Sequence, residues 1–474
     1  MSSLQYPYAF DRTDTAAGIR ARHGSLEPGS DTGETVRVAG RVRTVRTHGK
    51  VAFADVVDAS GAIQLFAQHS VLGDAGMEAF ESIGVGDIVG AEGEVVLTRR
   101  GELSVRVATT TVLAPCMRPM PDGWHGMTDV ERRYRQRYLD LIVNPEVRGV
   151  IEARAAANDA VRRFLRDRAF VEVETPLLHP VAGGAVARPF VTHHNALEMD
   201  LFLRVAPELY LKRLLIGGVE RVYELNRSFR NEGISARHNP EFTMLEAYEA
   251  YVDYHHTMDL VEDLVRAIAK AITGSLLIAR GDGGIDLRPR FTRMTMFDAM
   301  RAAGAPDLEA AWRRGDASAV TAAAKECGVR VEDGWPPGKV LTELFEATTE
   351  RGLVQPTYVV GYPKDVSPLT RDHRDLPGFT EHADLYIAGV EMAPVYSELN
   401  DPAEQRHRFE QQARARAGGD EEAAVSDEDF LEALAYGMPP AGGFGLGMDR
   451  LLAVLLGAPS IREVILFPAL RPGS

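Results

Sequence analysis

The chain has 474 residues, of which 45% are hydrophobic and 26% charged, and this is enough apolar material for the cores of two or three domains. Its formal net charge of -15 excludes a uniformly basic nucleic-acid-binding protein, although one domain can still carry a local basic stripe. Cys116 and Cys327 lie far apart, which argues against a disulfide framework or a cysteine zinc site. No segment has the roughly 18 uninterrupted apolar residues of a membrane span, so we expect a cytoplasmic protein without a membrane partner.

The N-terminal quarter is expected to form a small β-barrel. Residues 1–34 are polar and lack a sustained period, which predicts a loosely ordered lead-in. Residues 36–113 contain five β-rich runs separated by turn residues, with a short helix expected near 73–82 between the third and fourth runs. Five strands with one interposed helix are typical of an OB-type barrel, and we assign this domain to residues 1–118.

The first of these runs alternates between basic and apolar side chains. A period of two places three arginines on one face of the strand and three valines on the other: Arg37, Arg41 and Arg43 against Val36, Val38 and Val42. A solvated strand face would explain such arginines. The nearby Phe53, Gln64 and Phe66 favour RNA binding instead, because barrels of this type stack unpaired bases on aromatic rings.

A second, larger domain is expected after a linker. Residues 119–140 are rich in turn-forming and polar residues, which indicates the linker, and residues 141–474 form the second domain. Helical periodicity over 147–169 precedes the strand-and-turn sequence FVEVETPLL. Strand-like runs alternating with helices follow, including an alanine-rich, acidic helical stretch between about 299 and 325.

Two segments of this domain are rich in residues suited to phosphate chemistry. GGFGLGMDR, at 442–450, has neither dinucleotide-binding nor P-loop spacing, which disfavours a dehydrogenase or a P-loop enzyme. FRNEGISARHNPEFTMLEAY, at 229–248, is expected to be a strand, a loop and a strand. It combines many charged and aromatic groups, although a solvated charged hairpin remains an alternative: Arg230, Glu232, Arg237, His238, Glu241, Phe242 and Glu246.

These segments resemble a known family. ETPLL, FRNEGISARHNPEFTMLE and GLGMDR resemble motifs 1, 2 and 3 of the class II aminoacyl-tRNA synthetases. The runs GGAVARPFVTHHNALEMDLFLRVAPELYLKRL, YSELND and SIREVILFPALRP resemble the bacterial lysyl enzymes in particular, and two further segments are similar to actinobacterial members. The resemblance implies an α+β protein, in which the barrel precedes a catalytic domain built on an antiparallel sheet flanked by helices.

The resemblance also implies a reaction and a set of nucleotide-binding residues. The expected activity is ATP-dependent formation of lysyl-adenylate, followed by transfer of the lysyl group to the 3′ end of tRNA(Lys) for translation. The two motif arginines would hold the phosphates of ATP as catalytic cations. The full ATP-binding set implied by the resemblance is Arg230, Glu232, His238, Phe242, Glu391 and Arg450.

A metal site and an amino-acid pocket follow from the same resemblance. Asp384, Glu391 and Glu398 are expected to bind Mg²⁺, which prefers oxygen ligands and needs few carboxylates when phosphates complete its octahedron. Lysine needs an apolar slot that ends in carboxylates without a competing cation. The residues implied for this slot are Gly184, Glu208, Glu246, Tyr248, Tyr396 and Glu398.

The barrel and the motif 1 segment imply two partners. Arg41, Phe53 and Gln64 are expected to bind the anticodon of tRNA(Lys). Motif 1 of class II enzymes normally builds a two-fold interface, so a homodimer is expected.

Some positions depart from the family pattern. Pro394 and Val395 stand where the family usually has asparagine and a small residue, so the rim of the amino-acid pocket loses a backbone donor and a side-chain amide. Asp384 replaces the common glutamate, and Ala169 replaces the usual glycine of motif 1. Val186 also replaces a small residue.

These departures leave two alternatives open. The chain could be a divergent paralogue that delivers lysine or a lysine analogue to a non-translational acceptor, although such relatives commonly lack the barrel. A non-catalytic RNA-binding protein would not need Arg230, Glu391, Glu398 and Arg450 together.

Overall fold

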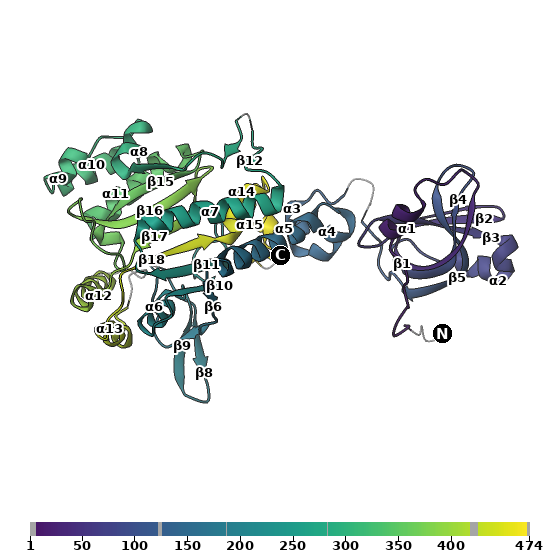
Figure 1. The fold of residues 1–474 in the computed structure, drawn as a ribbon, viewed down its shortest axis with the longest axis horizontal. Coiled ribbons are helices and arrows are strands. Elements are labelled where there is room, and N and C mark those ends of the chain that lie inside the picture. The colour runs from purple at the N-terminus through teal and green to yellow at the C-terminus, as the bar shows by residue number, and fades with distance from the viewer. Residues whose placement is uncertain (1–5, 122–125, 186, 282, 418–424, 472–474) are drawn as a thin grey trace. The chain divides into compact units, whose positions relative to one another are not determined.

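The structure is a computed structural model that describes residues 6–121, 126–185, 187–281, 283–417 and 425–471. The chain divides into two compact units, one of residues 1–133 with 142–144 and the other of residues 134–141 with 145–474. None of the helices in the described part combines the length and apolar character needed to cross a bilayer. Figure 1 shows the elements of both units, which are described separately below.

The first unit is a closed five-stranded barrel with strand order β1-β2-β3-β5-β4 (Figure 1), as the sequence predicts. Its valines and leucines alternate into one core, and Val36, Val38 and Val42 are buried there as expected. The predicted helix is present between the third and fourth strands. The elements are β1 Asp31–His48, β2 Val51–Val57, β3 Ala62–Gln68, α2 His69–Glu81, β4 Ile88–Leu97 and β5 Leu103–Ala114.

The prediction of a loosely ordered lead-in is wrong for the residues just before the barrel. Helix α1, Ala16–His23, begins at Thr15, whose side chain accepts a hydrogen bond from the backbone N–H of Gly18. Ala16 and Ile19 pack into the barrel core. A helix of eight residues offers too few apolar positions for its period to be recognised in the sequence.

The second unit is built on an eight-stranded sheet with order β14-β15-β16-β17-β18-β11-β10-β6. The sheet is antiparallel except at its edges, where β14 pairs with β15 and β6 with β10 in parallel. The expected antiparallel sheet is therefore a mixed one. Its strands are β6 Val171–Glu172, β10 Arg221–Phe229, β11 Glu241–Ala250, β14 Thr292–Thr295, β15 Thr357–Pro363, β16 Phe379–Ile387, β17 Val390–Ser397 and β18 Ala441–Gly447.

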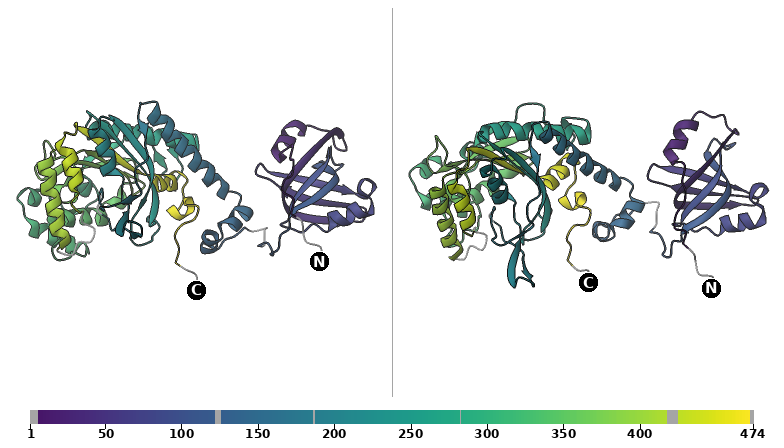
Figure 2. Two further views of the ribbon diagram at one scale, coloured as in Figure 1. Left: turned by 90° about the horizontal axis from the view of Figure 1, so that it is seen from below. Right: turned by 60° about the horizontal axis from the view of Figure 1, so that its bottom comes forward.

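Helices cover both faces of this sheet (Figure 2). One face packs against α5 Val147–Arg166, α7 Tyr254–Thr273 and α14 Met448–Leu455. The other face packs against two separate groups of helices, which leave the middle strands accessible between them. The first group is α6 Glu208–Ile216, α12 Pro402–Ala417 and α13 Glu428–Ala435; the second is α8 Met296–Ala302, α10 Ala317–Glu326 and α11 Pro337–Thr348.

Shorter elements complete the structure, and the two helices within residues 130–143 contain residues of both units. Two small sheets lie outside the main one, and the expected linker, residues 119–140, contains one short helix and the start of another. The remaining elements are α3 Val130–Arg135, α4 Arg137–Val143, β7 Leu178–His179, β8 Val191–His194, β9 Met199–Leu203, β12 Leu277–Ile278, β13 Ile285–Asp286, α9 Glu309–Arg313, η1 Glu350–Gly352, η2 Lys364–Val366 and α15 Ile461–Val464.

The expected helix over 147–169 is α5, and it ends in a turn that leads into β6. In this turn Ala169 has φ of 62°, a left-handed conformation that favours glycine. The glycine that the family usually has here would therefore relieve strain. Val186, the other small-residue departure, lies outside the described residues.

Candidate active site

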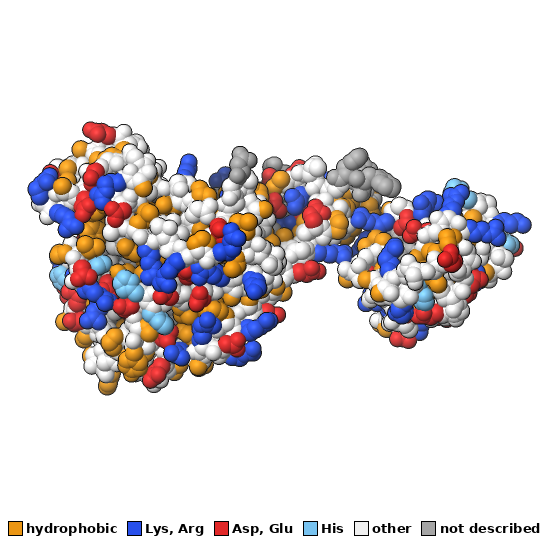
Figure 3. Space-filling view, turned by 45° about the horizontal axis from the view of Figure 1, so that its top comes forward, with side chains coloured by type: hydrophobic (Ala, Val, Ile, Leu, Met, Phe, Trp, Pro, Cys, Tyr) orange, Lys and Arg blue, Asp and Glu red, His pale blue; other side chains and the backbone are white. Residues whose placement is uncertain are grey.

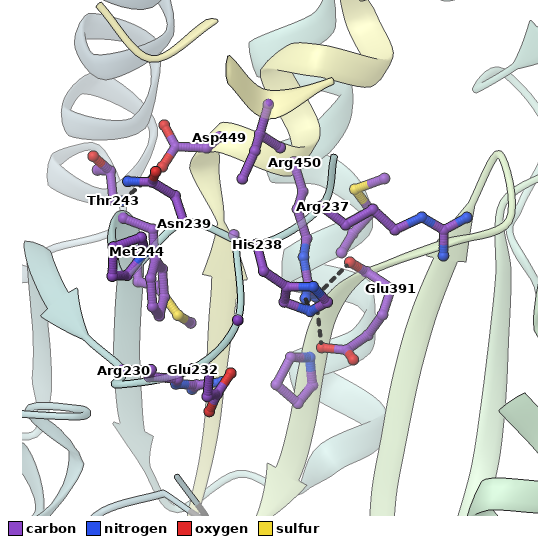
Figure 4. A pocket seen from close by; sticks show the side chains of 17 residues that line it. Arg230, Glu232, Arg237, His238, Asn239, Thr243, Met244, Glu391, Asp449 and Arg450 are labelled. Atoms are coloured by element: carbon purple, nitrogen blue, oxygen red, sulfur yellow. Dashed lines mark hydrogen bonds and ion pairs between the residues drawn. The ribbon is translucent and has the colours of Figure 1, made fainter. Parts of the chain in front are cut away.

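A cavity lies on the sheet face between the two groups of helices, and Figure 4 shows its lining. The loop between β10 and β11, the start of β17 and the start of α14 contribute its walls. The predicted strand-loop-strand segment is thus confirmed: β10 and β11 pair from Arg221 with Glu249 to Phe229 with Glu241, and the loop between them borders the cavity.

The cavity lies where two central strands are not hydrogen-bonded to each other. β17 pairs with β16 along its length, but it pairs with β18 only over Val395 to Ser397. Pro394, the residue before this stretch, has no backbone N–H to donate and lines the cavity. Val395 faces the opposite way and is buried in the core. Only one of the two departures, Pro394, therefore borders the site.

Arg230 is held on one wall with unused hydrogen-bonding capacity. Its backbone N–H donates to Pro240 O at 2.9 Å, which closes the base of the loop. Its guanidinium lies 5.2 Å from the ring centre of Phe242. Within the described part of the chain, the buried Nε of Arg230 has no hydrogen-bond partner. A buried donor without a partner indicates that a ligand oxygen is accommodated beside it.

Arg450 stands on the other wall, at the start of α14 (Figure 4). Its Nη1 donates to Glu391 O at 3.1 Å and lies 3.3 Å from the Glu391 carboxylate. Its Nη2 lies 3.4 Å from His238 Nε2. Burial, together with the cations of Arg450 and Arg230, lowers the pKa of His238, which favours a neutral imidazole.

Three interactions fix the loop and the helix that carry these cations. Arg237, within the loop, forms an ion pair of 2.7 Å with Glu350. The buried Asp449 accepts a hydrogen bond from the Thr243 backbone N–H at 2.8 Å and pairs with Arg154. Asp449 was not predicted as a site residue, although it directly precedes the motif arginine. Glu232 is exposed at the cavity mouth.

Every second side chain of β11 lies on the face that borders the cavity, and this series continues along the strand beyond the cavity. Phe242 and Met244 line the cavity, and Glu246 and Tyr248 follow on the same face of the strand. Tyr248 OH donates to Glu246 Oε2 at 3.3 Å. Burial, and then the nearby Glu208, raise the pKa of Glu246 to about 8. This carboxyl is therefore mainly protonated at neutral pH.

The other residues predicted for the amino-acid pocket also meet here. Gly184 has φ of 91°, a backbone conformation that favours glycine, and it lies beside Ala206 and Glu208. Glu398 Oε1 is buried against Gly443, where a Cβ would come within 2.2 Å of it. The Tyr248 ring borders the same position. Tyr396 lies within electrostatic range of Glu208 and Glu398.

The expectation that no cation competes for these carboxylates is wrong. Lys212, which is completely buried, places its Nζ 2.7 Å from Glu208 Oε1 and 2.5 Å from Glu398 Oε2. Burial alone lowers the pKa of Lys212, but the two carboxylates raise it overall, so the ammonium stays charged. The spacing of four residues between Glu208 and Lys212 on α6 was a visible signal of this pair. The contact with Glu398 depends on the fold.

The three predicted metal ligands do not form a cluster. Glu398 pairs with Lys212, Asp384 Oδ1 with His382 Nε2 at 2.7 Å, and Glu391 with Arg450. Among the described residues, no group of three His, Cys, Asp or Glu could hold a metal ion. Of the three, Glu391 lines the cavity, whereas Glu398 is paired with Lys212.

On the barrel, the predicted anticodon residues lie on the outer surface formed by β1, β2 and β3. Phe53 and Phe66 stack in parallel, with ring centres 5.1 Å apart and both rings partly exposed. Gln64 Oε1 accepts a hydrogen bond from Ser104 Oγ at 3.0 Å. Arg41 donates to Gly86 O at 2.7 Å. The aromatic pair is thus the part of this surface open to a stacking partner.

Comparison with known proteins assigns a family to both units. Residues 129–471 match the family described as tRNA synthetases class II (D, K and N), and residues 36–113 match the OB-fold nucleic acid binding domain. The chain is 50% identical to the lysine–tRNA ligase of Moorella thermoacetica over 468 residues, which cover 98% of this chain and 94% of that protein. The chain belongs to the class II lysine–tRNA ligase family. 

Other lysine–tRNA ligases of this family agree with the assignment. The chain is 49% identical to the protein of Carboxydothermus hydrogenoformans over 98% of this chain and 94% of that protein. It is also 49% identical to the protein of Xanthomonas oryzae, over 99% of this chain and 93% of the relative. The likeness therefore extends over the barrel and the catalytic unit together.

Proposed function

We propose that the chain activates L-lysine with ATP and transfers the lysyl group to the 3′ end of tRNA(Lys). The lysine carboxylate attacks the α-phosphorus of ATP, pyrophosphate leaves, and lysyl-adenylate forms. A ribose hydroxyl at the tRNA end then attacks the lysyl carbonyl carbon, and AMP leaves. The observation that carries this proposal is the cavity with two cations on opposite walls, together with the buried carboxyl of Glu246 farther along the same face of β11.

In the first step, Arg230 and Arg450 bind the phosphates of ATP. Charge builds on the α-phosphate as the carboxylate attacks, and a cation that is already in place stabilises that charge without reorganisation. The partnerless Nε of Arg230 supports its assignment to the α-phosphate, and Arg450 then binds the γ-phosphate. Phe242 and His238 accept the adenine, with Glu232 at the mouth of the cavity.

The lysine side chain occupies the pocket beyond Glu246. Gly184 leaves room for the substrate, and Tyr248 and Tyr396 border the aliphatic stem. Glu208 and Glu398 bind the ε-ammonium. An amino acid without this cation would leave a buried carboxylate unpaired, which costs several kcal/mol, so binding alone can reject it.

Mg²⁺ is the expected cofactor of the first step. The residues fit it in part: Glu391 supplies a partly exposed carboxylate beside Arg450, and Asp384 supplies a second oxygen donor on the neighbouring strand. One or two carboxylates are the usual protein contribution, because phosphate oxygens and water complete the octahedron. When bound, the metal ion neutralises phosphate charge.

The aromatic pair of the barrel supports RNA binding. Phe53 and Phe66 offer a flat apolar surface for an unpaired base, and Gln64 and Arg41 contribute polar groups to the same side of the barrel. Figure 3 shows basic and acidic side chains intermixed over one face of each unit, so the acidic net charge does not exclude tRNA from local basic positions.

A two-fold homodimer is the proposed assembly. The motif 1 segment leaves apolar side chains on the surface, with Val171 52%, Leu177 47% and Leu178 43% exposed. Apolar residues grouped in this way favour an interface with a second copy. Measurement of the solution mass at micromolar concentration tests this, and an active monomer would contradict it.

Two assays test the proposed reaction. Lysine-dependent exchange of pyrophosphate with ATP measures adenylate formation, and charging of purified tRNA(Lys) measures transfer. We expect both with L-lysine. Exchange without any charging would instead support the non-translational acceptor, and no exchange with lysine would contradict the proposal.

A further inference from the structure

The amino-acid pocket already contains one ammonium group, which belongs to the protein itself. Lys212 lies on α6 one turn after Glu208, and its Nζ lies between the carboxylates of Glu208 and Glu398. Its third partner is Leu369 O at 3.3 Å. Two of these contacts, to Glu208 and to Leu369 O, are hydrogen bonds, and the contact with Glu398 is an ion pair.

Lys212 uses only one oxygen of each carboxylate. It pairs with Oε1 of Glu208 and with Oε2 of Glu398. Glu398 Oε1 points elsewhere, against Gly443 and the Tyr248 ring, and it is buried without a hydrogen-bond partner in the described structure. A buried carboxylate oxygen without a donor is costly, and an incoming donor removes that cost.

The charges of the pocket also favour the binding of one additional cation. Glu208 and Glu398 are two carboxyl groups around one resident cation. Burial raises the pKa of Glu398 to about 7 against the opposing effect of Lys212, and it raises the pKa of the third carboxyl, Glu246, to about 8. When Glu208 and Glu398 are both ionised, Lys212 balances only one of the two negative charges. A single substrate ammonium balances the other, whereas a neutral side chain leaves that charge buried and unpaired.

We infer that Lys212 is a permanent counter-ion that orients Glu208 and Glu398 and limits the pocket to one further cation. This inference rests on the proposed binding of lysine in this pocket and adds a positioning residue to it. Lys212 itself touches the carboxylates, and it acts on the substrate through them.

Chemical rescue tests whether Lys212 acts through its charge or only by filling space. Replacement Lys212→Ala leaves room for the atoms beyond Cβ, which n-propylammonium reproduces and n-propanol matches only in shape. We expect Lys212→Ala to lower kcat/KM for lysine in pyrophosphate exchange by on the order of 100-fold, mainly through KM, because a buried anion loses its partner. Added n-propylammonium should recover at least about tenfold of this in a saturable manner, consistent with one restored charged contact.

Two control variants separate the loss of the Lys212 charge from a loss of volume and from the loss of any ion pair. Lys212→Met keeps the volume of the side chain and should show the same raised KM without rescue. Arg266→Met removes a similar ion pair, with Glu262 at 2.6 Å on α7, and should leave KM for lysine unchanged. Thermal melting of each variant confirms that it is folded.

Two results would overturn the inference. One is a KM for lysine in Lys212→Met within about twofold of the wild type, since loss of a charged partner predicts a far larger change. The other is rescue of Lys212→Ala by n-propanol as effectively as by n-propylammonium. The wild type is assayed in parallel, because a wild type inactive with lysine contradicts the proposed function and not the role of Lys212 alone.

Discussion

The outer surface of the barrel and the open face of the eight-stranded sheet both place functional residues by strand alternation, but they treat charge differently. On the barrel, Arg41 and Gln64 have local protein partners, and the stacked phenylalanines stay partly exposed. On the sheet, charged groups such as Lys212 and Glu398 are buried and depend on one another. A surface that contacts a large RNA can remain open, whereas a pocket that selects one small cation has to exclude water.

The largest expected effect comes from the phosphate cations of the sheet. Arg230→Ala and Arg450→Ala should each lower adenylate formation by about 100-fold or more, because each removes a cation placed before the reaction. Pyrophosphate exchange measures the loss. Arg227→Ala, on the exposed side of β10, is the matched control and should stay near the wild-type rate. Near-normal exchange in either motif variant contradicts the assignment.

Glu246 makes the stability of the catalytic unit depend on pH. Its folded pKa of about 8 lies above the ordinary value of 4.5, so the folded state binds more protons between these values, and the free energy of unfolding falls as pH rises through this window. Glu246→Gln should remove a fall of up to a few kcal/mol between about pH 5 and pH 8.

Urea unfolding at several pH values measures this effect of Glu246. Glu432→Gln, an exposed glutamate of the same unit, serves as control and should leave the slope unchanged. An unaltered slope in Glu246→Gln would show that this carboxyl is not the group that titrates.

The barrel should affect only the second half of the reaction. Phe53→Ala removes one ring of the stacked pair and should weaken tRNA charging by roughly 1–3 kcal/mol, while pyrophosphate exchange stays almost unchanged. The exposed Thr109→Ala on β5 is a control that should alter neither assay. Equal losses in both assays would mean that Phe53 has a structural role, and the contrast between the two surfaces would fail.

The smallest expected effect concerns Pro394 at the edge of the cavity. If Glu208 and Glu398 fix the ammonium, Pro394→Asn should lower KM for lysine by up to about tenfold, consistent with one regained hydrogen bond of about 1 kcal/mol. Pro394→Ala restores the backbone N–H without the amide and so separates the two contributions.

The preference for lysine over its analogues is a second test of the role of Pro394. Lysine should remain preferred over β-amino analogues in the wild type. A KM for lysine that is unchanged or higher in Pro394→Asn would show that proline is not what distinguishes this pocket. A β-amino analogue with the higher kcat/KM would indicate a rebuilt pocket.

Sequence alone determined the parts of this protein that depend on local pattern. Alternation of valines predicted the barrel strands, helical period predicted α5, and the mixture of arginines and turn residues at 229–248 predicted the hairpin beside the cavity. Helix α1 was missed, because its two buried residues, Ala16 and Ile19, are too few to give a period. These successes and this failure have the same cause, since periodicity is a property of neighbours in the chain.

Only the tertiary structure decided which charges meet. Glu398 lies 186 residues after Lys212, and the ion pair between them forms because α6 packs on the face of the sheet near the end of β17, which Glu398 directly follows. That pair involves Glu398, one of the expected metal ligands, and places a cation where the sequence predicted none. Strand pairing likewise decided that Pro394 borders the cavity and Val395 does not. Charges interact through space, so the pairing of acids and bases far apart in the chain follows from packing and not from spacing.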